Sequence, residues 1–284
     1  MPSVGMRRSV RGVDDVVTSP RREIRPPDRI LQLAESRAVF EFGAFLAASP
    51  ALRFAGRGDR HPVLVLPGFT AGDRSTAPLR AVLRSQGYWT HGWQLGPNYG
   101  PTDRIVGGLD RRLQQLHERH EQPVSLIGWS LGGIYARELA RLQPTRVRQV
   151  ITLGSPFRMV DGDRSAASGL ADRMAKRFSS EWTALALDEA IRAPLRVPST
   201  AIYSRTDGVC RWHTCIDEVS PTHENIEVRG SHSGLGFNPA VIFAVSDRLA
   251  QRRGEWRPFK PPLTMRHVFP RPASFEPFTA PGLS

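Results

Sequence analysis

The chain has 284 residues, of which 40% are hydrophobic and 23% are charged, with a formal net charge of +12. This length suits one large domain and is short for two, and the apolar fraction is high enough to bury a full core, which excludes wholesale disorder. More than half of the excess charge lies in the two ends, and only two of the 39 basic residues are Lys. This bias indicates a GC-rich genome rather than a phosphate-binding surface, so we expect no nucleic-acid partner.

The N-terminal part predicts an arm followed by a helix. Residues 1–27 carry several Arg and Pro without an apolar period, which is typical of a mobile arm. Residues 28–48 predict an amphipathic helix with Asp28 as its N-cap; an interfacial membrane anchor is the alternative, but the Lys/Arg-rich polar face that it needs is missing. The predicted apolar positions are Ile30, Leu31, Ala34, Ala38, Phe42, Phe45 and Leu46.

Membrane and targeting signals are also weak in this part of the chain. Asp14 and Asp15 interrupt the position where a signal peptide needs about 7–15 apolar residues. The most apolar stretch, 38–48, is shorter than the roughly 20 residues of a membrane-spanning helix. We therefore expect a cytoplasmic protein without a transmembrane segment.

Strands and helices alternate through the middle of the chain. Strands of an α/β sheet with parallel βαβ units are predicted at 63–69, 88–93, 124–129, 147–153, 199–204 and from Ile226. Helices are predicted at 77–86, 103–119, 134–142 and 240–251. The result is a single domain over 28–251, followed by a Pro-rich tail at 252–284 that is either disordered or wrapped on the surface.

A G-x-S-x-G pattern centred on Ser130 joins a predicted strand to a predicted helix. In this context the pattern predicts a nucleophile elbow, a sharp turn that exposes the serine hydroxyl at the sheet edge. A Cβ two residues before or after the serine would clash in such a turn, which explains Gly128 and Gly132. The hydroxyl needs a base, and the base needs an orienting acid.

The acid and the base are expected after Ser130 in the chain, in that order. Asp207 follows one predicted strand and His232 follows the last, so parallel strands deliver both to the edge where Ser130 lies. The predicted catalytic residues are therefore Ser130, Asp207 and His232. Weaker candidates are the acids Asp217 and Glu218 and the histidines His91, His117, His120, His213, His223 and His267.

The oxyanion of an acyl-transfer intermediate needs backbone donors. We predict the N–H groups of Leu131, directly after the serine, and of Phe69, in the loop after the first strand. The sequence has neither the Cys/His spacing of a metal site nor a nucleotide-binding glycine pattern, so no metal and no cofactor are expected. Cys210 and Cys215 are too few for a disulfide framework. We expect reduced thiols, or a bridge if a turn brings them together.

The predicted strand ends and the residues that follow them resemble the α/β-hydrolase superfamily, in particular its small bacterial lipase- and esterase-like members. The resemblance implies a mostly parallel central sheet with helices on both faces and a small helical cap, here at about 158–197. It also implies the triad of Ser130, Asp207 and His232 and an oxyanion hole at Phe69 and Leu131. The matching segments are HPVLVLPGF, GWQLGPNYGP, SLIGWSLGG, ITLGSPF, AIYSRTDGV and GSHSGLGFNP.

The leading functional hypothesis is a serine hydrolase that cleaves carboxylic esters, lipase- or esterase-like, through an acyl-enzyme. The expected partner is a small-molecule or lipid ester, and the sequence carries no signal for an oligomeric state. An acyltransferase or a thioesterase could use the same triad. A non-catalytic binding protein that keeps the fold is the third hypothesis, and the intact set of candidate residues argues against it.

Overall fold

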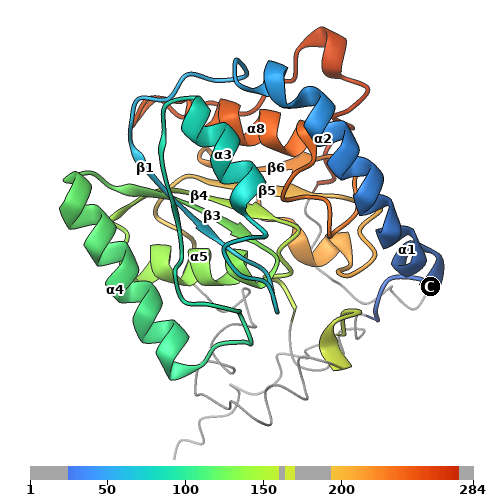
Figure 1. Ribbon diagram of the computed structural model, residues 1–284, viewed down its shortest axis with the longest axis horizontal. Helices are drawn as coiled ribbons and strands as arrows, with labels where there is room; N and C mark the ends of the chain where they lie inside the picture. Colours follow the sequence, from blue (N-terminus) through green and yellow to red (C-terminus); the bar gives the residue numbers. More distant parts are fainter. Residues whose placement is uncertain (1–24, 160–163, 170–192, 275–284) are drawn as a thin grey trace, which may run out of the picture.

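In the described part of the chain, six parallel strands form one sheet in the order β2-β1-β3-β4-β5-β6 (Figure 1). The computed structural model describes residues 25–159, 164–169 and 193–274. The predicted parallel sheet with alternating helices is confirmed. Most of the predicted cap at 158–197 and nearly all of the predicted arm at 1–27 lie outside the described residues.

The strands are short and almost wholly buried, as expected where helices cover both faces of a parallel sheet. The last strand begins earlier than predicted, at His223 instead of Ile226, so His223 belongs to the strand and not to the loop before it. The strands are β1 (Pro62–Leu66), β2 (Trp89–Gly92), β3 (Val124–Trp129), β4 (Val147–Leu153), β5 (Ser199–Tyr203) and β6 (His223–Glu227).

Alternating residues of β1 point into two different cores. Val63 and Val65 pack in the layer of α2 (Ala38–Leu52), α3 (Ala77–Ser85) and α8 (Pro239–Leu249). Leu64 and Leu66 pack with α4 (Asp103–His120) and α5 (Leu131–Leu142) on the opposite face. Figure 1 shows these two helical layers on either side of the sheet.

The N-terminal segment differs from the single amphipathic helix that was predicted. A 3-10 helix (Ala34–Arg37) separates α1 (Arg29–Leu33) from α2. Because a 3-10 helix has fewer residues per turn, it shifts the phase of the residues that follow. Leu46, which follows the 3-10 helix and was predicted to be buried, is therefore 58% exposed, whereas Phe45 is buried. Ile30, also predicted to be buried, lies in the short α1 before the 3-10 helix and is 80% exposed.

Asp28 occupies the N-cap position of α1, but its side chain makes no capping hydrogen bond. It pairs with Arg211 instead, 3.2 Å away. This ion pair joins the start of the N-terminal segment to the loop after β5.

The described part of the tail lies on the protein surface. Phe259 and Phe269 contact each other and Phe243 of α8, and a 3-10 helix (Leu263–Met265) lies between them in sequence. The backbone N–H of Ala273 donates to the Tyr203 hydroxyl at 2.7 Å. None of the helices in the described ranges combines the length and the apolar character needed to cross a membrane.

Candidate active site

Ser130 occupies the turn between β3 and α5 in a conformation that non-glycine residues seldom adopt. Its φ is 53° and its ψ is −123°. Such strained backbone persists only where the surroundings hold it, and it concentrates at functional sites. One of those restraints is the hydrogen bond that its N–H donates to the Leu153 carbonyl at 2.8 Å. The predicted strand-to-helix turn is confirmed.

The glycines around the serine are needed for close backbone packing. A Cβ on Gly128 would overlap the Gly132 carbonyl and the Gly133 Cα at the start of α5. A Cβ on Gly132 would overlap the backbone of Leu66 at the end of β1. The predicted steric requirement at both positions is confirmed, and α5 can approach the sheet only because both lack a side chain.

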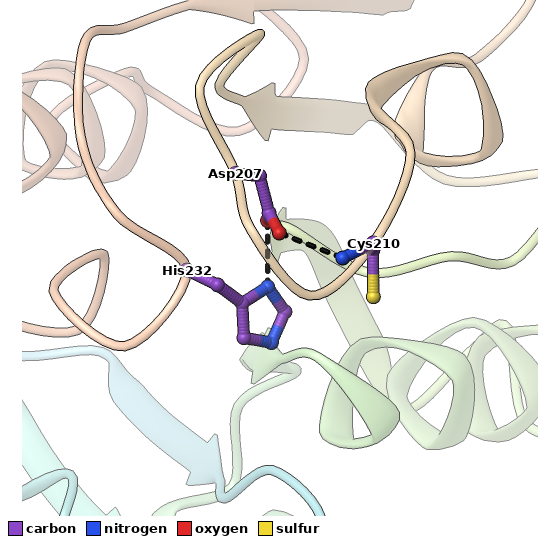
Figure 2. A group of neighbouring side chains, drawn as sticks. All are labelled: Asp207, Cys210 and His232. Carbon is purple, nitrogen blue, oxygen red and sulfur yellow. Dashed lines mark hydrogen bonds and ion pairs between the residues drawn. The ribbon is translucent and has the colours of Figure 1, made fainter. Parts of the chain in front are cut away.

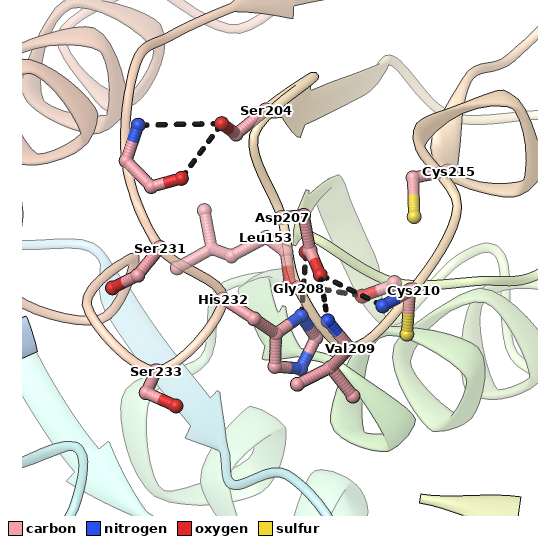
Figure 3. Close-up of polar contacts among 12 residues, drawn as sticks. Leu153, Ser204, Asp207, Gly208, Val209, Cys210, Cys215, Ser231, His232 and Ser233 are labelled. Atoms are coloured by element: carbon pink, nitrogen blue, oxygen red, sulfur yellow. Dashed lines mark hydrogen bonds and ion pairs between the residues drawn. The ribbon is translucent and has the colours of Figure 1, made fainter. Parts of the chain in front are cut away.

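Asp207 and His232 meet at the same sheet edge, beyond the ends of β5 and β6 (Figure 2). His232 Nδ1 lies 2.6 Å from Asp207 Oδ2, and both residues are buried. The other carboxylate oxygen of Asp207 accepts from the backbone N–H groups of Val209 and Cys210, at 2.8 and 2.7 Å (Figure 3). The carboxylate is thus fixed by its own loop and directed at the imidazole.

Nearby negative charges stabilise the imidazolium form of His232. Burial by itself lowers the pKa of His232, but the charge of Asp207, its hydrogen bond to the ring and the charge of Glu35 outweigh burial and raise the pKa above 6.5. An imidazole held by a buried carboxylate in this way has the arrangement of a general base with its orienting acid.

Two contacts join this pair to the serine turn. Trp129, which precedes Ser130, donates its indole N–H to the His232 carbonyl at 3.1 Å. A Cβ on Gly154, at the end of β4, would lie 3.1 Å from Asp207 Oδ2 and 3.3 Å from His232 Nδ1. Since Leu153 next to this glycine accepts from the Ser130 N–H, all three predicted catalytic residues gather around the ends of β3 and β4.

The loop after β1 passes over Ser130. A Cβ on Gly68 would lie 3.2 Å from the Ser130 Cβ and 3.9 Å from its Oγ. The backbone N–H groups of Phe69 and Leu131 have no hydrogen-bond acceptor within the described ranges of the chain. Two unpaired donors beside a serine hydroxyl could hold a developing oxyanion.

Asn98 holds this loop in place, and the sequence-based prediction missed it. Its side-chain amide donates to the Pro67 carbonyl at 3.0 Å, and its own carbonyl accepts from the Thr70 N–H at 2.6 Å. The Tyr135 hydroxyl donates to Asn98 Oδ1 at 3.2 Å. The sequence shows only an Asn inside the Gly- and Pro-rich segment GPNYGP, which is equally typical of an ordinary turn.

Asp217 and three of the weaker histidine candidates have partners outside this site. Asp217 forms a buried ion pair with Arg137 at 2.7 Å, and Glu218 donates its backbone N–H to Asp217. His91 and His120 face each other at 2.9 Å between their Nε2 atoms, and His117 contacts the Gln122 carbonyl.

Asp207, Cys210 and His232 also have the ligand types of a metal site, with ligand atoms within 4.8 Å of one another (Figure 2). Both carboxylate oxygens of Asp207 already accept hydrogen bonds, one from His232 and the other from the backbone N–H groups of Val209 and Cys210. Cys210 and Cys215 are both free thiols. The donor set therefore fits an acid–base pair better than a metal centre.

No protein-family model matches the chain. A pimeloyl-[acyl-carrier protein] methyl ester esterase from Shewanella woodyi is 27% identical over 133 residues, 47% of this chain and 51% of that protein. An esterase of the same name from another Shewanella is 27% identical over 137 residues, 48% of this chain and 50% of that protein. The chain spans about half the length of these curated relatives.

Among solved structures, lipase B from Aspergillus fumigatus superposes with a TM-score of 0.53 at 16% identity, covering 71% of this chain and 55% of that one. The match in fold agrees with the parallel sheet, the two helical layers and the serine turn described above. The predicted resemblance is confirmed at the level of the fold: the chain has the α/β-hydrolase fold.

Proposed function

We propose that the protein is a serine hydrolase of carboxylic esters. Ser130 is the nucleophile and His232 is the general base. Asp207 orients the imidazole and stabilises the imidazolium that forms. The backbone N–H groups of Phe69 and Leu131 form the oxyanion hole. The similarity to curated esterases supports the ester as the substrate class.

The reaction proceeds in two acyl-transfer steps. Ser130 Oγ attacks the ester carbonyl carbon while its proton passes to His232 Nε2, and the oxyanion lies against the two backbone donors. The C–O bond to the alcohol then breaks, and the imidazolium returns the proton to the leaving oxygen. Water repeats the sequence on the acyl-enzyme, which releases the acid and restores Ser130.

One observation carries this assignment above the others. The 2.6 Å hydrogen bond between His232 Nδ1 and Asp207 Oδ2 leaves Nε2 as the ring nitrogen available to the serine. The strained serine turn, the Asp207 loop and the His232 loop follow three different strands, β3, β5 and β6. Such convergence at the carboxyl edge of a parallel sheet is where active sites of this architecture form.

The direct test is hydrolysis of p-nitrophenyl esters from acetyl to palmitoyl, combined with fluorophosphonate labelling of the folded protein. We expect turnover with one acyl-length optimum and a label that maps to the peptide containing Ser130. An added alcohol acceptor distinguishes hydrolysis from transfer by the ratio of acid to new ester. Folded protein that neither turns over an ester nor takes the label contradicts the proposal.

Replacing the proposed acid should greatly slow turnover. We expect Asp207→Asn to lower kcat about 10³- to 10⁴-fold, because an amide can donate to Nδ1 and then favours the wrong imidazole tautomer. KM should change little, since Asp207 is buried behind the ring. Steady-state kinetics on the best p-nitrophenyl ester measure both constants.

Asp217→Asn is the matched control for this variant. It removes the same charge from another buried carboxylate, one that is paired with Arg137 instead of His232. We expect a lower melting temperature, because a buried charge loses its partner, with kcat within about twofold of the native value. If Asp217→Asn silenced the enzyme and Asp207→Asn did not, the acid would be wrongly assigned.

The pH dependence should follow His232. The base must be neutral to accept the serine proton, and its pKa lies above 6.5. We therefore expect kcat/KM to rise with pH through a midpoint above 6.5, as measured with a neutral ester from about pH 5 to about pH 9. A midpoint near 4 would point to His61 or His91 instead, whose pKa burial lowers to about 4.

A further inference from the structure

Two carboxylates of the N-terminal segment, those of Glu35 and Glu41, accept hydrogen bonds from the loops that carry Asp207 and His232. Glu35, in the 3-10 helix, accepts with Oε1 from the backbone N–H groups of Gly208 at 2.8 Å and His232 at 2.9 Å. Its Oε2 accepts from the Ser233 N–H at 2.8 Å. One side chain therefore holds the backbone of the proposed base and the residue directly after the proposed acid. Figure 3 shows Gly208, His232 and Ser233 around Asp207.

Arg37 ties the same two loops together through their carbonyl groups. Its Nη2 donates to Thr206 O at 2.5 Å and to Gly230 O at 2.9 Å. Thr206 immediately precedes Asp207, and Gly230 lies two residues before His232. The segment 34–37 thus contacts both loops, because the Glu35 carboxylate accepts hydrogen bonds from them and the Arg37 guanidinium donates hydrogen bonds to them.

Two glycines in these loops are explained by the docked segment. A Cβ on Gly208 would overlap the Leu31 carbonyl of α1. A Cβ on Gly234 would overlap the Glu41 carboxylate of α2, which accepts from the N–H and hydroxyl of Ser231 at 2.7 and 2.9 Å. The absence of side chains at these two positions gives the segment close access to the acid and base loops.

The Glu35 carboxylate is charged at neutral pH. Burial raises the pKa of Glu35, but the three backbone N–H groups outweigh burial and lower the pKa below its usual value. The charges that raise the pKa of His232 are those of Asp207 and Glu35. Glu35 therefore acts on the imidazole electrostatically as well as through the backbone.

We propose that Glu35 is a positioning residue for the base: it fixes the backbones of His232 and Gly208 so that the ring faces Asp207, and its charge stabilises the imidazolium formed when Ser130 attacks. This inference rests on the proposed function for its catalytic consequence. The predicted effect of Glu35 on the titration of the His232 ring can be measured without turnover.

The test is the titration of the His232 ring by NMR, read beside the pH profile of kcat/KM, in native protein, Glu35→Gln and Glu41→Gln. The His232 signal is assigned by its loss in His232→Asn. In Glu35→Gln we expect the His232 titration and the acidic limb of the pH profile to move together to lower pH. We also expect kcat to fall roughly tenfold with KM nearly unchanged.

Glu41→Gln is the matched control, because it alters a neighbouring carboxylate that holds the same loop through Ser231 and not through His232. Its His232 titration should stay at the native position. Glu35→Asp keeps the charge on a shorter side chain, so its His232 titration should move to lower pH by less than that of Glu35→Gln. If Glu35→Gln does not fold, an unshifted His232 titration in Glu35→Asp overturns the inference.

A native-like His232 titration in Glu35→Gln, or an equal shift in Glu41→Gln, overturns the inference. An inactive native protein with a shifted titration in Glu35→Gln alone would overturn the proposed function and leave the electrostatic role of Glu35 intact. Thermal melts of each variant establish that the measured protein is folded.

Discussion

Ser130→Ala is expected to lower kcat for ester hydrolysis about 10⁴- to 10⁶-fold and to abolish fluorophosphonate labelling. The reason is that the acyl-enzyme cannot form without Oγ, whereas the oxyanion donors and the binding site remain. The fold should survive, because Ala keeps the Cβ in the strained turn and the backbone hydrogen bond to Leu153 is unaffected. Steady-state kinetics and a thermal melt on the same preparation measure the two effects.

The double variant Ser130→Ala/His232→Ala makes this prediction more specific. Triad members act as a unit, so the combined loss should be close to that of either single variant and far below the product of the two. Multiplicative losses would show that the two residues act in separate steps. Residual hydrolysis near the native rate in Ser130→Ala would mean that another nucleophile performs the reaction.

The second large effect is on stability. Gly128→Ala should destabilise the protein by about 3–5 kcal/mol, because the added Cβ overlaps the backbone of Gly132 and Gly133. Backbone cannot rotate away as a flexible side chain can, so α5 must separate from β3. Chemical denaturation of purified protein measures the loss in the free energy of unfolding.

Gly43→Ala is the control for this substitution, since it adds the same methyl group to an exposed position of α2 with nothing within 4 Å of the new Cβ. We expect a gain of about 0.5–1 kcal/mol, because Ala loses less backbone entropy than Gly in a helix. Similar stabilities for Gly128→Ala and the native protein would contradict the packing assigned to the serine turn.

Several features of this protein were predictable because their cause is local in the chain. Apolar β-branched runs such as VLVL determine buried parallel strands, and the glycine spacing around Ser130 determines a turn that few other sequences tolerate. Chain order and strand ends were then enough to select Asp207 and His232 from the other acids and histidines. Their 2.6 Å hydrogen bond agrees with that selection.

Other features had no local cause and were missed or misjudged. The phase of the N-terminal helix was wrong because a 3-10 helix at Ala34–Arg37 interrupts the period. Asn98 was not singled out, because its partners Pro67 and Tyr135 lie more than 30 residues away in the chain. Glu35 was not singled out, because its hydrogen-bond partner His232 lies 197 residues further along the chain.

The sequence by itself therefore determined the sheet, the serine turn and the order of the candidate catalytic residues, because backbone sterics and hydrophobic periodicity act between near neighbours in the chain. Only the tertiary structure decided which groups hold those residues in place. Buried backbone donors must find acceptors wherever the fold brings them, and here the fold brings carboxylates from the N-terminal segment to the loops of Asp207 and His232.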